Sequence, residues 1–188
     1  MIIHQPSTRT HRLAIPGLAS DRLAPALARR LDDAYHYVRD VAAGGTPPIE
    51  AVVVGPGGTW ALTTTRVRGR FRKRNGHWYT WSRATESWIP WDPRPITEAR
   101  LAGHRLELYL ERATLPAIVE PCLVNGRSTE IDWEPDQRPG IHVQRDVERL
   151  AARIVRDEVL TPAQVDRIVA LLDPRQPLPR LVTSSTGG

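Results

Sequence analysis

The amino-acid sequence predicts a mixed α/β fold, and three observations support this prediction. Short apolar or alternating runs flank turn-forming residues twice between residues 51 and 81, which is typical of β-hairpins. Apolar residues recur at helical spacing over 98–113. Further strand-like and helix-like segments follow up to residue 172. With 188 residues, the chain is expected to form one domain with a sizeable core.

The first hairpin is predicted around Gly55-Pro56-Gly57-Gly58, because glycine and proline favour tight turns. Apolar runs at 51–54 and 60–62 flank this turn and supply its two strands. The glycines do not predict a phosphate-binding loop, because neither a lysine nor a helix follows them.

The second hairpin is predicted around Asn75-Gly76, the strongest short-range signal for a two-residue turn. The runs 66–74 and 77–81 alternate in side-chain type on either side of it. Trp78 and Trp81 fall on opposite faces of a regular strand, so one sheet face can bury at most one of them.

The remaining strands and helices are predicted from apolar runs and apolar periodicity. The stretch 98–113 predicts a helix with one core-facing stripe, and strands are predicted over 116–124, 131–133 and 140–143. A further helix places these apolar residues on one side: Val147, Leu150, Ala151, Ile154 and Val155.

Helix ends are also indicated by the sequence. Thr161-Pro162-Ala163-Gln164 is a capping-box pattern with proline at the first helical position, which predicts a last helix that ends before Pro174. Ser20 or Asp21 is a candidate N-cap for an early helix, and Pro25 fits the first turn of such a helix.

The sequence predicts three regions along the chain. Residues 1–16 form an N-terminal segment, and residues 17–173 form the single domain. Residues 174–188 are rich in Pro, Ser, Thr and Gly, a composition that favours a flexible tail because it buries little apolar surface.

The composition limits the class of protein and the chemistry. Cys122 is the only cysteine, which excludes an internal disulfide, and its apolar surroundings predict a buried thiol. The six histidines have no metal-ligand spacing, so no zinc site is expected. Because no apolar run is long enough to cross a bilayer, we expect a soluble, cytoplasmic protein with no membrane partner.

Positive charge is concentrated in one segment. The formal net charge is +5, but residues 66–74 hold six cations and no acid, so the rest of the chain carries −1. These cations are Arg66, Arg68, Arg70, Arg72, Lys73 and Arg74. On a strand, four of them share one face at intervals of roughly 6 to 7 Å, namely Arg66, Arg68, Arg70 and Arg72. Such a local basic stripe indicates a binding site for a polyanion such as nucleic acid.

Aromatic residues follow this basic segment directly, at Trp78, Trp81, Trp88 and Trp91. Rings interleaved with arginine can stack on unpaired bases, although tryptophans more often belong to the core. The alternative interpretation of the arginines is a solvated face that protects a sheet edge. Lys73 is the only lysine among 26 basic residues, and this bias toward arginine also lowers the weight of any single arginine.

The hairpin at 49–65 resembles a known nuclease-related family. It reads Ile49-Glu50, an apolar strand, Gly55-Pro56-Gly57-Gly58, a second apolar strand and Thr63-Thr64-Thr65. The NERD domain, a branch of the PD-(D/E)XK restriction-endonuclease-like superfamily, typically reads Ile-Asp-His, strand, Gly-Pro-x-Gly, strand, Glu-Thr-Lys. Gly17-Leu18-Ala19-Ser20-Asp21 and Pro95-Ile96-Thr97-Glu98-Ala99 extend the similarity, which covers residues 17–124. The resemblance implies a restriction-endonuclease-like core.

The resemblance also implies a degenerate active site. In this superfamily two carboxylates hold a magnesium ion and a lysine supports the nucleophile. Glu50 stands at the position of the family's aspartate, whereas Thr63 and Thr65 stand at those of the glutamate and the lysine. A threonine hydroxyl replaces neither a carboxylate ligand nor a positive charge. No catalytic residue, metal or cofactor is therefore expected.

In one alternative interpretation the protein retains nuclease activity. Asp21, Glu50 and Glu98 could form a rearranged carboxylate site that binds Mg²⁺ and cleaves nucleic acid. Arg66 follows the position of the missing lysine, but strand alternation directs it to the face opposite Thr65. Glu98 has a simpler explanation as a favourable charge near a helix N-terminus.

Together these patterns favour a nuclease-related domain without cleavage activity that acts as a nucleic-acid-binding or regulatory module. The nucleic acid can be DNA or RNA. An active Mg²⁺-dependent nuclease is the first alternative. A protein-interaction scaffold, in which the arginines are merely solvated and the partner is a protein, is the second.

Overall fold

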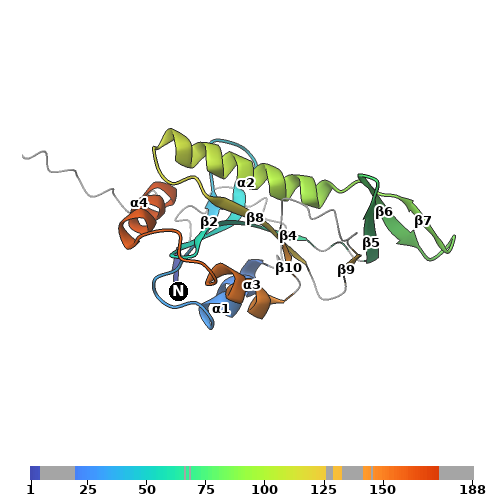
Figure 1. The fold of residues 1–188 in the computed structure, drawn as a ribbon, viewed down its shortest axis with the longest axis horizontal. Helices are drawn as coiled ribbons and strands as arrows, with labels where there is room; N and C mark the ends of the chain where they lie inside the picture. The colour runs from blue at the N-terminus through green and yellow to red at the C-terminus, as the bar shows by residue number, and fades with distance from the viewer. Residues whose placement is uncertain are drawn as a thin grey trace, which may run out of the picture.

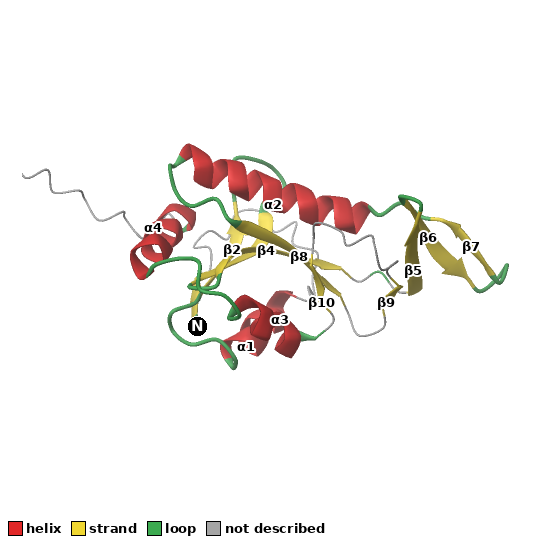
Figure 2. Ribbon diagram, viewed as in Figure 1, coloured by secondary structure: helices red, strands yellow, loops and turns green. Residues whose placement is uncertain are grey.

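The computed structural model describes residues 1–4, 20–65, 67, 69–125, 129–132, 142–144 and 146–173. Within these residues the chain forms a mixed α/β structure with a large sheet between helices and a small sheet at one end (Figures 1 and 2). The strands of the large sheet are β1 (Ile2–His4), β2 (His36–Val41), β3 (Ile49–Gly55), β4 (Gly58–Thr65), β8 (Val119–Asn125) and β10 (His142–Gln144).

The large sheet has the order β1-β2-β3-β4-β8-β10. The pairs β2–β3 and β3–β4 are antiparallel, whereas β1–β2, β4–β8 and β8–β10 are parallel. β1 lies within the N-terminal segment that the sequence places before the domain, and its three residues had no strand pattern of their own. The sheet has a nearly continuous apolar centre, because β3 and β4 are buried on both faces.

Helices cover both faces of the large sheet (Figure 2). These helices are α1 (Ser20–Ala28), α2 (Arg94–Arg112), α3 (Val147–Ile154) and α4 (Pro162–Leu172). One apolar cluster joins α1 and α3 to residues such as Ala51 and Leu62, and a second joins α2 and α4 to residues such as Val52 and Ala61. Alternate residues of the same strand therefore belong to different clusters. None of the helices in the described residues is long and apolar enough to cross a membrane.

The first predicted hairpin is confirmed, and its turn is packed against α3. Gly55 pairs with Gly58, and Gly58 has a φ of +106°, which favours glycine. A Cβ placed on Gly57 would lie 1.6 Å from the backbone oxygen of Ile154. The turn therefore needs glycine at position 57 because the end of α3 approaches its backbone closely.

The helix predictions are confirmed in part. The last helix has the predicted capping box, in which the Gln164 backbone N–H donates to Thr161 Oγ1 and the Thr161 N–H donates to Gln164 Oε1. The helix predicted over 98–113 begins earlier, at Arg94. The placement of Pro25 in a first turn is wrong, because α1 begins at Ser20 and Pro25 lies inside it. The buried-thiol prediction for Cys122 is confirmed, and burial raises its pKa to about 12.

The small sheet lies beyond the N-terminal end of α2 (Figure 1). Its order is β7-β6-β5-β9, and its strands are β5 (Gly69–Arg74), β6 (His77–Ser82), β7 (Ser87–Pro90) and β9 (Thr129–Asp132). β5 pairs antiparallel with β6 around Asn75-Gly76, both with positive φ, as a two-residue hairpin turn of type I′ requires. This confirms the second predicted hairpin, but β4 and β5 belong to different sheets.

A third apolar cluster fastens the small sheet to the large one. Phe71 and Trp78 of the small sheet pack with Ile96 and Ala99 of α2 and with Leu123 of β8. Trp91, which follows β7, lies 4.4 Å from Phe71 between ring centroids. One face of the small sheet is therefore core. In the described part of the structure the side chains of the opposite face are exposed or half-buried, and we call it the open face.

Candidate nucleic-acid interface

Thr63 and Thr65 lie at the end of β4 nearest the small sheet. Thr63 is half-buried, and Thr65 is only 8% exposed. Thr65 accepts a hydrogen bond from the Val67 N–H at 3.3 Å and is the register partner of Asn125. Thr65, Phe71 and Trp91 also line a cavity of about 10 Å³. The Thr65 hydroxyl is thus enclosed between the two sheets.

Glu50 is held by Thr64. Its Oε2 accepts a hydrogen bond from the Thr64 backbone N–H at 2.6 Å, and its Oε1 accepts one from Thr64 Oγ1 at 2.7 Å. Both carboxylate oxygens therefore already have donors. This arrangement lets a half-buried carboxylate join the start of β3 to the end of β4 without a metal ion.

No contact between described side chains joins Glu98 to Glu50. Glu98 is half exposed on α2, and its Oε1 accepts from Nε of Arg94 at 2.8 Å, one helical turn earlier. Asp21 belongs to α1, and its side chain lies outside the described part of the structure. Among the described residues, no three His, Cys, Asp or Glu side chains are grouped as metal ligands.

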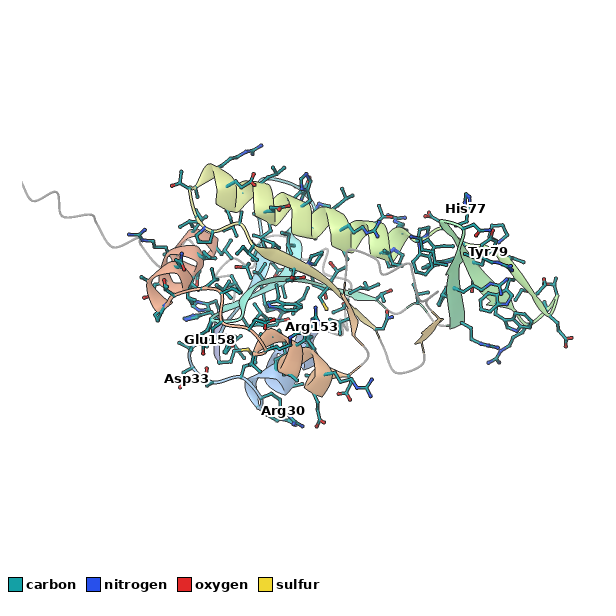
Figure 3. The ribbon with its side chains drawn as sticks, viewed as in Figure 1. Arg30, Asp33, His77, Tyr79, Arg153 and Glu158 are labelled. Atoms are coloured by element: carbon teal, nitrogen blue, oxygen red, sulfur yellow. The ribbon has the colours of Figure 1, made fainter. Side chains whose placement is uncertain are left out.

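The open face of the small sheet carries arginines and aromatic rings. Register pairs Arg72 with Tyr79 and Arg74 with His77 across β5 and β6, and Trp81 with Trp88 across β6 and β7. His77 and Tyr79 project from β6 in Figure 3. We call this surface the arginine–aromatic face, and it comprises Arg70, Arg72, Arg74, His77, Tyr79, Trp81 and Trp88.

The arginine–aromatic face is organised by cation–π contacts. The Arg72 guanidinium carbon lies 4.3 Å from the Trp88 ring centroid and 5.9 Å from that of Tyr79. The corresponding atom of Arg70 lies 5.9 Å from Trp81 and 5.8 Å from Trp88. The Trp81 and Trp88 rings meet edge to face at 5.5 Å. Each contact stabilises the sheet by about 0.5 to 1 kcal/mol and keeps the cations and rings in fixed positions.

The predicted basic stripe is only partly within the described residues. Arg70 and Arg72 share a face as predicted, and Arg74 continues it, whereas Arg66 and Arg68 lie outside the described residues. Lys73 pairs with Trp78 on the opposite face. Because β5 starts at Gly69, the described stripe extends over β5 and not over the whole of 66–74.

The tryptophans divide between core and surface. Trp78 is 9% exposed within the apolar cluster, and its carbonyl accepts from the Trp91 N–H at 2.9 Å. Trp81 and Trp88 are half-buried on the arginine–aromatic face. The prediction that Trp78 and Trp81 lie on opposite faces is confirmed.

Sequence reasoning did not single out His77 or Tyr79. The signal was nevertheless present, because a two-residue turn at Asn75-Gly76 fixes the cross-strand pairs. Counting outward from that turn places His77 opposite Arg74 and Tyr79 opposite Arg72, as the structure has them. In chemical terms the surface offers guanidinium donors for phosphate oxygens and partly exposed rings for planar groups.

Comparisons with protein-family models, with curated proteins and with solved structures found no significant match for this chain.

Proposed function

We propose that this chain is a nucleic-acid-binding module built on a restriction-endonuclease-like core of the NERD type, and that it does not cleave its ligand. One observation carries the proposal: Arg70 and Arg72 lie among Trp81, Trp88 and Tyr79 on a single open sheet face. Guanidinium groups bind phosphates through paired N–H donors, and rings stack on bases. The arginine–aromatic face combines both.

The distribution of charge supports a polyanionic ligand. The hairpin formed by β5 and β6 carries Arg70, Arg72, Lys73 and Arg74 within five consecutive positions. The remainder of the chain outside 66–74 carries a net charge of −1, so the positive potential is focused on one end of the molecule. Focused charge of this kind accelerates and orients the encounter with nucleic acid.

The surroundings of Glu50 and Thr65 support the absence of cleavage. Metal-dependent hydrolysis needs carboxylate oxygens that are open to a cation and a nearby charge that stabilises the transition state. Both Glu50 oxygens accept hydrogen bonds from Thr64, and Thr65 is a buried neutral side chain where the family has a lysine. The alternative carboxylate Glu98 is paired with Arg94. These contacts favour a binding module over an Mg²⁺-dependent enzyme using Asp21, Glu50 and Glu98.

The proposal is tested by titrating fluorescent DNA and RNA with the protein over a salt series, with and without Mg²⁺, and by resolving the same samples on a denaturing gel. We expect salt-sensitive binding and intact ligand in every sample. The double variant Arg70→Gln with Arg74→Gln removes two phosphate contacts and should reduce the slope of log K against log salt by roughly 1 to 2.

Arg112→Gln is the matched control, because Arg112 is exposed at the opposite end of α2 from the small sheet. Its affinity should stay within about twofold of the wild type. Equal losses in the control and the double variant would contradict the arginine–aromatic face as the interface. Mg²⁺-dependent cleavage that Glu50→Gln abolishes would instead establish a nuclease, and no binding at low salt would favour a protein-interaction scaffold.

A further inference from the structure

The arginine–aromatic face is arranged in rows that cross the small sheet. Each row holds one arginine of β5 and one or two side chains of β6 and β7. The rows are Arg70 with Trp81 and Trp88, Arg72 with Tyr79 and Pro90, and Arg74 with His77. Every row thus places a cation beside a ring. In all three rows the cation lies on β5 and the ring lies on β6 or β7.

The rows repeat along the strands at a fixed interval. Residues two apart on a strand are separated by roughly 6 to 7 Å. The backbone of an extended single strand can supply one phosphate and one base at about this interval, because it is not held in a helical stack. A strand running along β5 would therefore bring a phosphate to each arginine and a base toward each ring.

We infer that the ligand of this face is an unpaired nucleic-acid strand, and that its bases stack against Trp81 and Trp88. This inference rests on the proposed function and specifies its substrate class. In a duplex the base faces are covered by neighbouring base pairs, so a row of rings adds nothing to phosphate binding. In a single strand the base faces are open to aromatic side chains.

Arg72 has a separate part in this arrangement. Its guanidinium lies closest to Trp88, at 4.3 Å, and its Nε is buried with no hydrogen-bond partner among the described residues. The cation is therefore held against the ring, and its terminal N–H groups are the donors available for a phosphate. Trp88 positions Arg72 and also stacks on a base, so this ring contributes both to phosphate binding and to base stacking.

The residue types argue against a ligand recognised by charge alone. Exposed arginines without rings would serve a simple polyanion equally well, whereas Trp81, Trp88 and Tyr79 are left half-buried on the open face. Half-buried rings beside fixed cations gain most from a ligand that is both planar and anionic. Nucleotides with accessible bases have both properties, and polyphosphate has only the charge.

The test compares four probes by fluorescence anisotropy: a 12-nucleotide oligo(dT), a 12-nucleotide oligo(U), a 12-base-pair DNA duplex and polyphosphate used as a competitor. We expect both single strands to bind more tightly than the duplex. Trp88→Leu should weaken single-strand binding by about 5- to 150-fold, the range for loss of one stacked base, and should change competition by polyphosphate far less.

Two further variants keep the result interpretable. Trp88→Phe retains a ring and should stay close to the wild type, which separates loss of stacking from loss of folding. Tyr109→Leu removes a half-buried ring on α2, far from the small sheet, and should leave affinity unchanged. Thermal unfolding of every variant checks that the fold is intact.

The outcomes separate this inference from the function on which it rests. Equal affinity for duplex and single strand, or unchanged single-strand affinity in Trp88→Leu, overturns the inference and leaves nucleic-acid binding standing. Polyphosphate that competes as strongly as oligo(dT) at equal charge also overturns it. No binding of any nucleic acid at low salt overturns both.

Discussion

His4 Nδ1 lies 2.8 Å from Oδ2 of Asp173, although 169 positions separate the two residues. Both side chains are 6% exposed, and His4 Nε2 lies 3.0 Å from Nδ1 of His36. A carboxylate can only accept, so His4 donates from Nδ1 to Asp173. This chain of contacts joins the edge strand β1 and its neighbour β2 to the C-terminal end of α4.

The first prediction concerns this buried pair. Asp173→Ala removes the acceptor of the His4 Nδ1–H and leaves a buried donor unpaired. We expect the free energy of unfolding to fall by about 1 to 3 kcal/mol, because a buried donor that loses its acceptor keeps the cost of its desolvation. Urea unfolding monitored by circular dichroism measures this loss. Glu111→Ala, an exposed change on α2, should lie within about 0.5 kcal/mol of the wild type, and an equally small effect of Asp173→Ala would contradict the structural role of the pair.

The second prediction concerns the pH dependence of stability. Burial lowers the pKa of His36, the neighbouring His4 lowers it further, and Asp166 opposes both effects. The folded protein thus binds a proton on His36 less readily than the unfolded chain, whose histidine pKa is about 6.5. The contribution of neutral His36 to the free energy of unfolding is therefore complete above about pH 6.5. It decreases as the pH falls from 6.5 toward the lowered pKa of His36 in the folded protein.

Urea unfolding of His36→Asn at pH 7.5 and pH 5.5 tests this pH dependence. The variant should lose less stability between the two pH values than the wild type does. His104→Asn serves as the control, because the side chain of His104 is exposed on the surface of α2. An identical pH dependence in wild type and His36→Asn would show that the half-buried His36 is not the group that titrates.

The third prediction concerns the hairpin turn between β3 and β4. Gly57→Ala places a Cβ 1.6 Å from the Ile154 carbonyl oxygen, and neither backbone can move without disturbing β3, β4 or α3. We expect a loss of about 3 kcal/mol in the free energy of unfolding, at the upper end for overpacking. Gly45→Ala is the matched control, because its nearest neighbour is the flexible Arg105 side chain at 3.5 Å. Similar stabilities of the two variants would refute the close approach at Gly57.

The fourth prediction concerns Asn125 at the junction of the sheets. It is 5% exposed, and neither its amide nitrogen nor its oxygen has a hydrogen-bond partner among the described residues. Its neighbours around the small cavity include Phe71, Ile96 and Leu123. Asn125→Val should raise the free energy of unfolding by about 1 kcal/mol, because it removes an unpaired buried amide and suits a strand. A melting temperature of Asn125→Val below that of the wild type in differential scanning calorimetry would contradict this prediction.

The elements predicted correctly are those whose conformation depends on residues close together in the sequence. The turns at Gly55–Gly58 and Asn75-Gly76, and the cap at Thr161, depend on local backbone and side-chain preferences. Apolar periodicity placed the start of α2 at residue 98, whereas this helix begins at Arg94, because prolines at 93 and 95 interrupt the apolar pattern although proline is compatible with a first helical turn. Pro25 was misplaced because a proline usually marks the beginning of a helix and here lies inside one.

The candidate site was predictable to a similar extent. Arg70, Arg72 and Arg74 were identified from charge and alternation alone. Trp81 and Trp88 were among the aromatic candidates, and the turn at Asn75-Gly76 sets Tyr79 opposite Arg72. The contact between Arg72 and Trp88 was not predictable, because it depends on how a third strand, β7, aligns with β6. The sequence also gave no sign that Thr64 occupies both oxygens of Glu50, since that contact depends on the exact placement of two strand ends.

By itself the sequence determined the two hairpins, the pairing across β5 and β6, the capped helix α4 and the concentration of charge near residue 70. These features follow from short-range turn, cap and alternation rules. Only the tertiary structure decided that β4 and β5 belong to different sheets, that Thr65 is buried between them and that His4 meets Asp173. The physical reason is that apolar periodicity shows which face of an element is buried, whereas the packing of distant elements decides what covers that face.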